Sequence, residues 1–410
     1  MKIQRTIPPT AALLRIRDIF HGICGFVMPR TYLHDLESSL KSFFGVKHVF
    51  LVSSGKAAFT LILQSISALV PDKKDVIIPA YTCFSVPSAI VKSGLRVSPC
   101  DIDSSTFDFD YHHLQHILAE KALCIVPSHL FGMPSDMHKV RQFAKEHNVF
   151  VVEDSAQAMG GRLGDELLGT IGDVGFFSLG RGKNVTCMSG GIVVTNNDMI
   201  AREIKKRYAD LSRPTLAEDL MEIIKAVLLS LFIRPSLYWL PAGLPFLGLG
   251  KTIYSTEFPI RKLSRVQAGL MSRWQERLKK SNDVRKENGS FYSSALKTMK
   301  PCTHANPFLR FPYLCDDSPR QNEIYRNLKD FGVGLMYPSS INKIEELRDQ
   351  FEASAYPTAD SISSRLLTLP THELTSMSDR QKIVQSISRA SHLASIPELM
   401  KCSPQSTELT

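Results

Sequence analysis

Short runs of apolar residues alternate with longer mixed segments over the first half of the chain. Each run is rich in Val, Ile, Leu or Phe, and most are apolar at nearly every position. The seven runs are residues 49–53, 76–79, 97–101, 124–127, 149–153, 174–178 and 192–195. Such runs are typical of parallel strands that helices cover on both faces. The pattern predicts a large α/β domain built on a seven-stranded, mostly parallel sheet.

The segments between these runs have helical spacing. Between residues 57 and 69, apolar and small residues recur on one helical face. After residue 251, a second amphipathic helix is expected through Trp274, and alternating αβ patterns follow. These changes predict five parts: an N-terminal arm (1–32), a large α/β domain (33–222), an apolar insertion (223–257), a smaller C-terminal α+β domain (258–395) and a tail (396–410).

The role of the apolar insertion stays open between two interpretations. Between residues 226 and 250 the sequence has one charge, Arg234, and three prolines. The length approaches the ~20 residues of a spanning helix, but prolines and an internal arginine disfavour a regular one. Basic neighbours favour peripheral contact with an anionic bilayer, through residues 223–250. Packing in a dimer interface, or over the smaller domain, is an equal alternative.

Composition narrows the class of protein. The chain has 410 residues, of which 43% are apolar and 22% charged, with a net charge of +9. These values exclude a disordered chain, a small disulfide scaffold and a multi-span membrane protein. The positive excess permits an anionic partner, but no helix-turn-helix or basic–aromatic pattern predicts nucleic-acid binding.

The cysteines and histidines predict neither a disulfide framework nor a metal site. None of the eight cysteines forms a CxxC pair, and several lie in apolar runs. His112, His113 and His116 lack supporting carboxylates or cysteines, so we interpret them as part of a surface helix. The N-terminus has no signal-peptide pattern. We therefore expect a protein of the reducing cytoplasm, with recruitment to the inner face of the membrane left open.

Two strand ends carry candidate chemistry. The strand at 149–153 leads into Glu153 and Asp154, and ligands of open α/β sheets bind beyond such carboxyl ends. Alternatively, Asp154 caps the next helix. The strand at 174–178 leads into a glycine-bearing loop with Lys183. A partly desolvated lysine there can react with carbonyls, whereas a solvated loop lysine is the commoner case.

A third candidate lies between a strand and a helix. The segment Ser53-Ser54-Gly55-Lys56 offers free backbone N–H groups at a helix N-terminus, which bind anions. It is not a Walker loop, because Ala57 stands where Ser or Thr is required. Together the three features supply a phosphate anchor, a pyridinium partner and a Schiff-base lysine, which are the parts of a pyridoxal phosphate site.

At these residues the sequence resembles the DegT/StrS-type sugar aminotransferases, which are fold-type I pyridoxal-phosphate enzymes. The resemblance covers about residues 33–197 and 258–389. The matching stretches are SSGKAAF, IIPAYTCFSVPSAI, SHLFGMPSDM, VVEDSAQAMGG, GDVGFFSLGRGKN with SGGIVVTN, and LLTLPTHELT. The resemblance implies a fold-type I transferase with pyridoxal 5′-phosphate as its cofactor, working as a homodimer.

The resemblance assigns roles around the cofactor ring. Lys183 resembles the lysine that bonds the cofactor and then shuttles the substrate proton, so it is the expected catalytic residue. Asp154 resembles the partner of the pyridinium nitrogen, and its charge keeps that nitrogen protonated. Gln157 resembles the glutamine placed near the ring's 3-oxygen. For the phosphate, Ser178 resembles a phosphate-binding serine. Gly55 and Lys56 resemble the backbone cup that binds the same phosphate.

Three positions depart from the family pattern. Lys56 stands where the family often has Thr, which exchanges a hydroxyl for a charge beside the phosphate. Cys83 stands where an aromatic residue stacks on the ring, so stacking is weaker or Tyr81 or Phe84 substitutes. A neighbouring subunit's asparagine aligns with residues 260–262, which are Ile, Arg and Lys here.

The expected reaction is amino transfer, from glutamate, to a nucleotide- or lipid-linked keto-sugar in surface-polysaccharide or related glycan synthesis. Lys183 favours this over the dehydration that a histidine-bearing branch of the family performs. The alternatives are a non-catalytic or regulatory protein of the same fold, and a pyridoxal-phosphate enzyme for a non-sugar substrate.

Overall fold

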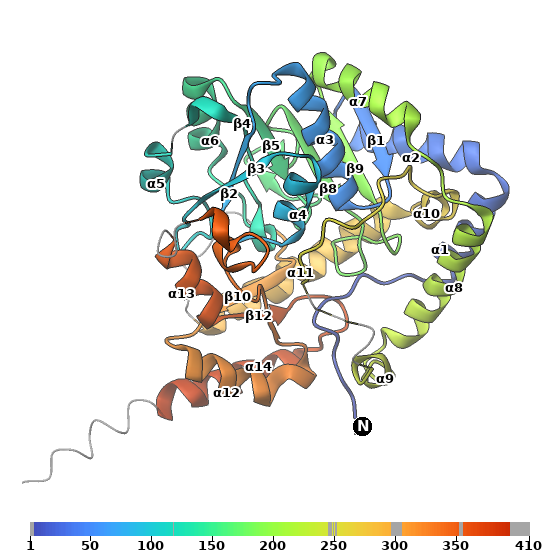
Figure 1. Cartoon of the computed structure of the whole chain (residues 1–410). Helices are drawn as coiled ribbons and strands as arrows, with labels where there is room; N and C mark the ends of the chain where they lie inside the picture. Colours follow the sequence, from blue (N-terminus) through green and yellow to red (C-terminus); the bar gives the residue numbers. More distant parts are fainter. Residues whose placement is uncertain are drawn as a thin grey trace, which may run out of the picture.

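The structure is a computed structural model of the chain, coloured along the sequence in Figure 1. It describes residues 4–117, 119–244, 248, 250, 252–296, 306–351 and 356–393. The predicted tail at 396–410 lies outside the described residues, as do Cys302 and Cys402.

All seven predicted runs form strands of one sheet, in the order β1-β9-β8-β5-β4-β2-β3. β9 pairs antiparallel with β1 and β8, and the other neighbouring strands pair parallel. The strands are β1 (His48–Val52), β2 (Asp75–Pro79), β3 (Arg96–Cys100), β4 (Ala122–Ile125), β5 (Phe150–Asp154), β8 (Val174–Ser178) and β9 (Gly191–Thr195). The predicted fold, a mostly parallel sheet inside an α/β layer structure, is confirmed.

Helices cover both faces of this sheet because successive strand residues point to opposite sides. In β8, Phe176 packs in the core under α3, whereas Phe177 packs in the core under α2. The first face is covered by α3 (Gly55–Leu69), α4 (Ser85–Lys92) and α7 (Asp198–Asp210). The second is covered by α2 (Pro29–Phe44), α6 (Met137–His147) and α10 (Arg265–Leu270). Peripheral to these lie α5 (Tyr111–Gln115) and the hairpin β6 (Arg162–Leu163) and β7 (Glu166–Leu167).

A second, antiparallel sheet forms from the C-terminal part of the chain, in the order β10-β12-β11. Its strands are β10 (Arg310–Leu314), β11 (Gly334–Leu335) and β12 (Leu366–Pro370). Its helices are α11 (Trp274–Leu296), α12 (Ser318–Leu328), α13 (Pro357–Arg365) and α14 (Met377–Leu393). Helix α11 connects the two regions, since Trp274 lies in the core beside α2 and Tyr292 in the core of the second sheet. The domain bounds themselves stay a prediction.

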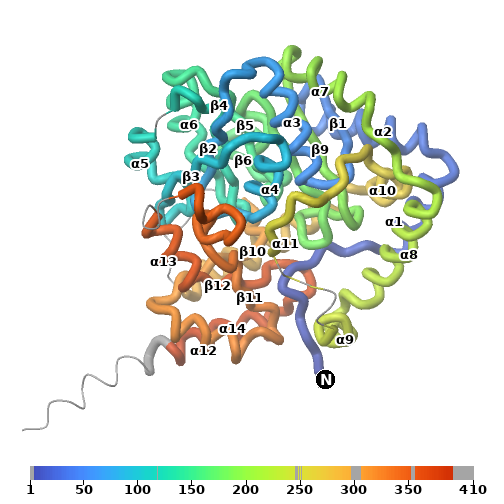
Figure 2. The backbone as a smooth tube through the Cα atoms, in the orientation of Figure 1, coloured from blue at the N-terminus to red at the C-terminus, as the bar shows by residue number. Residues whose placement is uncertain are grey.

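The N-terminal arm runs as an extended segment before α1 (Ile16–Val27). Figure 2 shows this segment, in dark blue, passing between the second sheet and α9. The insertion forms most of α8 (Leu216–Phe232) and all of α9 (Trp239–Ala242). Among the described residues, no helix is long and apolar enough to cross a membrane.

Candidate active site

The candidate residues follow strands whose carboxyl ends meet at one edge of the large sheet. Asp154 ends β5 and pairs in register with Phe176, two residues before Ser178 at the end of β8. Gly55 begins α3 just beyond β1. β1, β5 and β8 run in the same direction, because β1 and β8 both oppose β9. The three candidates therefore share the edge where open α/β sheets bind ligands.

Gly55 and Ser178 form the two sides of an anion cradle. Ser54 caps α3 by accepting a hydrogen bond from Ala57 N–H at 3.0 Å. The N–H groups of Gly55 and Lys56 point out of the first helical turn, where no intrahelical acceptor is available. A Cβ at residue 55 would lie 2.9 Å from Ser178 Cβ, so only glycine brings this helix end against the strand end. Free N–H groups and a hydroxyl facing one space suit a phosphate.

Lys183 lies in the tight loop between β8 and β9. Its backbone N–H donates to Gly180 O at 3.1 Å, and its side chain passes 3.8 Å from the place of a Cβ on Gly180. The side chain is half-buried and has no hydrogen-bond or ion-pair partner among the described residues. An amine held near the cradle without a partner is available to react with a bound carbonyl.

Asp154 is 9% exposed, and its Oδ1 accepts a hydrogen bond from Ala156 N–H at 3.0 Å. Burial raises the pKa of this carboxyl, while its hydrogen bonds and the positive charge of Lys183 act in the opposite direction. The local helix-cap interpretation does not hold, because β5 leads into a turn here and no helix begins at Asp154. The carboxylate is thus a buried acceptor within electrostatic reach of the candidate lysine.

Glu153, the other carboxylate of this strand, points away from the cradle and holds a loop. It accepts hydrogen bonds from Gly169 N–H at 2.8 Å and from Ile171 and Gly172 N–H at 2.5 Å each. Its Oε2 lies 3.0 Å from His129 Nε2. His129 Nδ1 accepts from Ser135 N–H at 3.1 Å, so Nε2 carries the proton shared with Glu153. Both side chains are satisfied within the protein and act structurally.

Gln157 connects the site to the second sheet region. Its Oε1 accepts from Phe131 N–H at 3.1 Å, and its Nε2 donates to Tyr337 Oη at 2.8 Å. The Tyr81 hydroxyl donates to the carbonyl of Met336 and accepts from Tyr337 N–H. Sequence reasoning missed Tyr337, because it lies 180 residues from Gln157 and no local motif marks it.

Cys83 and Lys56, the two departures from the family pattern, are close to each other. Cys83 lies near enough to interact electrostatically with both Lys56 and Tyr337. Lys56 Nζ lies 4.4 Å from the ring centre of Phe258, and Lys92 Nζ lies 4.8 Å from the same centre. Burial is the main cause that lowers the pKa of Lys56, and the charge of Lys92 adds to it.

The N-terminal arm contacts the lysine loop directly, which the sequence did not predict. Thr10 Oγ1 donates to Gly182 O at 2.7 Å. The buried guanidinium of Arg285 donates to Ala11 O at 2.8 Å and to Lys183 O at 3.5 Å. Burial lowers the pKa of Arg285 to about 10. These bonds fix the backbone on both sides of Lys183.

The segment aligned with the partner subunit's asparagine lies against β1 of its own chain. Ser53 N–H donates to Arg261 O at 2.9 Å. The Arg261 side chain pairs with Glu218, and Lys262 Nζ donates to Ala209 O at 3.0 Å. Neither basic side chain contacts the cradle within this chain.

Known proteins resemble this chain in sequence and in fold. The sequence model of the DegT/DnrJ/EryC1/StrS aminotransferase family matches residues 25–219 and 254–388. A pleiotropic regulatory protein of Geobacillus stearothermophilus is 29% identical over 203 residues, which are 49% of this chain and 54% of that protein. A GDP-perosamine synthase of Caulobacter vibrioides is 29% identical over 174 residues, 42% of this chain and 46% of that protein.

The chain therefore spans about half the length of the curated relatives it matches. A solved structure of Helicobacter pylori PseC, an aminotransferase involved in the biosynthesis of pseudoaminic acid, superposes with a TM-score of 0.73. The superposition covers 95% of this chain and 99% of PseC. Because only 16% of the aligned residues are identical, the likeness shows the fold alone.

Proposed function

The chain belongs to the DegT/DnrJ/EryC1/StrS aminotransferase family, and on this premise we propose that it is a pyridoxal-phosphate-dependent aminotransferase. Its acceptor would be a keto-sugar linked to a nucleotide or a lipid, and its donor glutamate. The product would enter surface-polysaccharide or related glycan synthesis. The observation that carries the proposal is the convergence of Lys183, Asp154 and the Gly55–Ser178 cradle at one sheet edge.

Aminotransferases of this family use pyridoxal phosphate, and the residues present fit that cofactor. The cradle at Gly55, which a Cβ would fill, has the N–H groups and hydroxyl that a phosphate needs. The buried carboxylate of Asp154 suits a protonated ring nitrogen, since burial leaves it without a full counter-charge. The unpartnered amine of Lys183 suits the cofactor's carbonyl carbon.

When bound, pyridoxal phosphate supplies an electron sink for the carbon that exchanges its amino group. The protein's residues would prepare that chemistry. Asp154 would hold a proton on the ring nitrogen. Lys183 would hold the cofactor through its amine and, as a base, would move a proton at the donor's α-carbon. Gln157, fixed by Phe131 and Tyr337, would orient the ring.

The partners proposed are the amino donor, the keto-sugar and a second copy of the chain. The homodimer is supported by the family resemblance, and native mass spectrometry of the purified protein tests it. We propose a cytoplasmic setting, which the six free cysteines of the described residues support.

The test begins with the purified protein and added pyridoxal phosphate. We expect a visible absorbance band that borohydride bleaches, and mass spectrometry should place the reduced cofactor on Lys183. Lys183→Ala should lose the band, whereas Lys145→Ala, an exposed lysine on α6, should keep it. A wild-type protein that folds but binds no cofactor contradicts the proposal. Screening nucleotide-linked keto-sugars with glutamate then identifies the acceptor by mass.

A regulatory protein of the same fold is the second candidate. It is favoured by one feature, Cys83 in the position of the aromatic ring-stacking residue. A half-reaction with glutamate separates the two. Conversion of the bound cofactor to its amine form, seen as a shift of the band, supports the enzyme. Cofactor binding without conversion supports the regulatory role.

A further inference from the structure

Two lysines, Lys56 and Lys92, lie against one aromatic ring beside the candidate active site, and we call them the lysine pair. Lys56 Nζ lies 4.4 Å from the ring centre of Phe258, and Lys92 Nζ lies 4.8 Å from the same centre. Lys56 belongs to the first turn of α3 and Lys92 is the last residue of α4. The segment of Phe258 is fixed just beyond β1, where Ser53 Oγ donates to Pro259 O at 3.3 Å. Two ammonium groups from different helices therefore meet at one ring, at the carboxyl edge of the large sheet.

Neither ammonium group has a carboxylate partner. Within the described ranges, no ion pair includes Lys56 or Lys92. Lys92 Nζ donates to the carbonyl of Thr256 at 3.0 Å, and the neighbouring acidic residue, Glu257, is exposed and pairs with neither lysine. Burial lowers the pKa of Lys56, and the charge of Lys92 lowers it further. Two like charges that repel each other, without a counter-charge, favour the binding of an anion.

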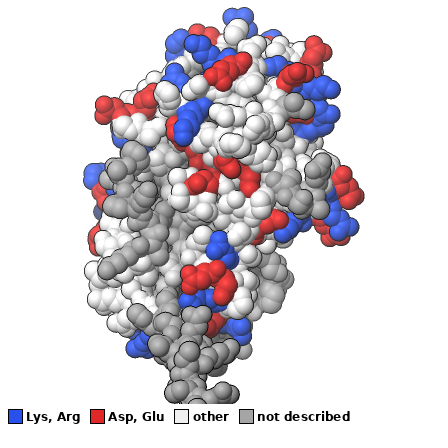
Figure 3. All heavy atoms as spheres, turned by 90° about the vertical axis from the view of Figure 1, so that its left-hand side faces the viewer, with Lys and Arg blue, Asp and Glu red and all other residues white. Residues whose placement is uncertain are grey.

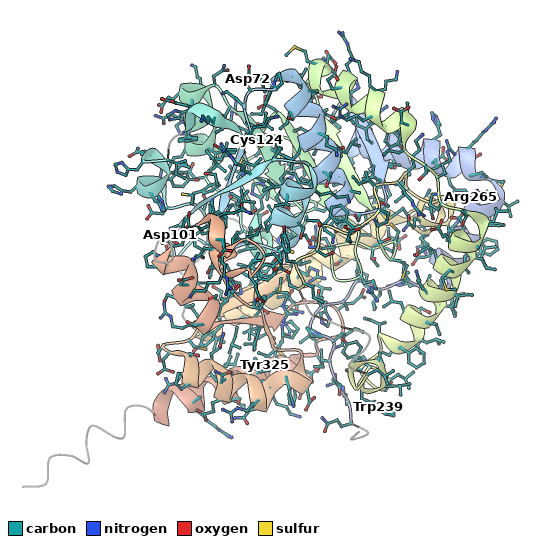
Figure 4. All side chains as sticks on the ribbon, viewed as in Figure 1. Asp72, Asp101, Cys124, Trp239, Arg265 and Tyr325 are labelled. Carbon is teal, nitrogen blue, oxygen red and sulfur yellow. The ribbon has the colours of Figure 1, made fainter. Side chains whose placement is uncertain are left out.

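The carboxylates that follow the neighbouring strands are engaged elsewhere. Asp101 follows β3 and is labelled in Figure 4, and it accepts hydrogen bonds from Thr358 N–H at 3.0 Å and from Ala359 N–H at 2.8 Å. Asp154 interacts electrostatically with Lys183. On the side of the molecule in Figure 3, by contrast, acidic and basic side chains are intermixed. The lysine pair thus keeps a local positive charge that a ligand can neutralise.

The lysine pair is separate from the cradle that suits the cofactor's phosphate. A Cβ at Gly55 would face Ser178, whereas the side chain of the next residue, Lys56, reaches Phe258 and lies near Cys83. The cradle offers backbone N–H groups and a hydroxyl, and it needs neither ammonium group. The lysine pair is therefore available to a second phosphate-bearing group beside the cradle.

We propose that the lysine pair binds the diphosphate through which the keto-sugar acceptor is attached to its carrier, and this inference rests on the proposed function. Phosphate oxygens accept strong charge-assisted hydrogen bonds from ammonium groups. A diphosphate diester carries a negative charge on each phosphate, and the pair supplies an opposite charge for each. An acceptor linked through a single phosphodiester would leave one ammonium group without a counter-charge. The pair therefore selects acceptors that are linked through a diphosphate.

Two features suit the lysine pair to this role. The Phe258 ring holds both lysine side chains by cation–π contact, so less side-chain freedom is lost when an anion binds. Lys56 stands where the family often has threonine, so the pair is not a general feature of the family. We expect the pair to set the acceptor preference of this chain.

The test titrates the protein, saturated with pyridoxal phosphate, with inorganic pyrophosphate in a calorimeter. Pyrophosphate has no sugar, base or lipid, so only the recognition of the diphosphate is measured. We expect binding that weakens at high salt. Lys92→Gln should weaken it about tenfold, and the double variant Lys56→Thr with Lys92→Gln should weaken it further. Lys145→Gln, which removes an exposed charge on α6, should bind pyrophosphate as the wild type does.

The cofactor's absorbance band, measured in parallel, separates the lysine pair from the cofactor's own phosphate. Lys56→Thr keeps the backbone N–H of residue 56, so the double variant should keep the wild-type affinity for pyridoxal phosphate and the wild-type melting temperature. A double variant that binds the cofactor about tenfold more weakly assigns the pair to the cofactor's phosphate and overturns the proposal. Wild-type protein that binds the cofactor but not pyrophosphate also overturns it, as does equal pyrophosphate affinity in the wild type and the double variant. Wild-type protein that binds no pyridoxal phosphate instead contradicts the proposed function, and this inference with it, so the two failures are distinct.

Diphosphate compounds that cannot accept an amino group then distinguish the two sources of the diphosphate. UDP-glucose, GDP-mannose and dTDP-glucose represent nucleotide carriers, and farnesyl diphosphate represents a lipid carrier. The carrier that the site takes should bind more tightly than pyrophosphate, and its affinity should fall in the double variant as that of pyrophosphate does. Affinities for these compounds that the double variant leaves unchanged overturn the proposal.

Discussion

The Nε2 of Gln157 donates a hydrogen bond of 2.8 Å to the hydroxyl of Tyr337, and this bond joins the large sheet to the region of the second sheet. Both side chains are buried, at 6% and 3% exposure. Tyr337 is also held by Tyr81, which bonds its backbone N–H. The residue expected to orient the cofactor ring is therefore itself oriented from a distant part of the chain.

Removing the Tyr337 hydroxyl tests this connection. Tyr337→Phe leaves one N–H of the buried Gln157 amide without its acceptor, which costs about 1–3 kcal/mol. We expect weaker cofactor binding and a lower free energy of unfolding, measured by cofactor titration and urea denaturation. Tyr325→Phe, on the surface helix α12, removes the same atom elsewhere and should change neither. Equal cofactor affinity in both variants would contradict the orienting role of Tyr337.

The close approach of Gly55 and Ser178 gives a second prediction. In Gly55→Ala the new methyl group would meet Ser178 Cβ at 2.9 Å, so the helix end must move away from the strand end. We expect cofactor affinity to fall by at least about tenfold, because the cradle's N–H groups no longer converge. Adding Ser178→Gly removes the clashing atoms and should recover part of the affinity relative to Gly55→Ala. If the Gly55→Ala protein keeps the wild-type cofactor affinity, the cofactor's phosphate binds somewhere other than this cradle.

The sheet and much of the site are predictable because they are local in sequence. Buried parallel strands are continuous apolar runs, and the residues that follow their carboxyl ends are brought together by topology alone. That logic marks Lys183, Gly55 and the pair Glu153 and Asp154 as candidates, and the family resemblance then assigns their roles. The topology alone cannot separate the roles of Glu153 and Asp154, since that depends on which side of the strand each carboxylate faces and on the loop that Glu153 holds.

The rest depends on contacts between residues far apart in the chain. Tyr337 reaches Gln157, Arg285 reaches Lys183, and Thr10 reaches Gly182, with separations of 180, 102 and 172 residues. The hydrophobic periodicity of the sequence does not indicate which distant residues pair. Lys56, Lys92 and Phe258 meet in the same way, from separate parts of the chain.

The contact between the arm and the lysine loop gives a third prediction. Thr10→Val keeps the shape of the side chain but loses the hydrogen bond to Gly182 O. We expect a loss of about 1 kcal/mol in stability and a reduced rate of the glutamate half-reaction, with cofactor affinity nearly unchanged. Thr10→Ser retains the hydroxyl and should restore the rate. A rate that is equal in the Val and Ser variants would show that the arm does not position Lys183.

A fourth prediction concerns the pH dependence of stability, through His372, which contacts the N-terminal arm. The ring is buried, with Nε2 2.8 Å from Pro8 O and Nδ1 accepting from Leu374 N–H. Burial, with the nearby charge of Arg285, lowers the pKa of His372 from 6.5 to about 3. Below pH 6.5 the unfolded chain therefore binds a proton that the folded chain does not, so stability falls as the pH falls.

This single group should cost about 2 kcal/mol of unfolding free energy between pH 7 and pH 5. His372→Gln offers an amide N–H in place of Nε2–H and does not titrate. The wild type should therefore lose about 2 kcal/mol more than His372→Gln over that interval, measured by urea denaturation at both pH values. Other titrating groups are common to both proteins and cancel in the difference. Parallel loss in the two proteins would mean that His372 is protonated in the folded state or reaches solvent.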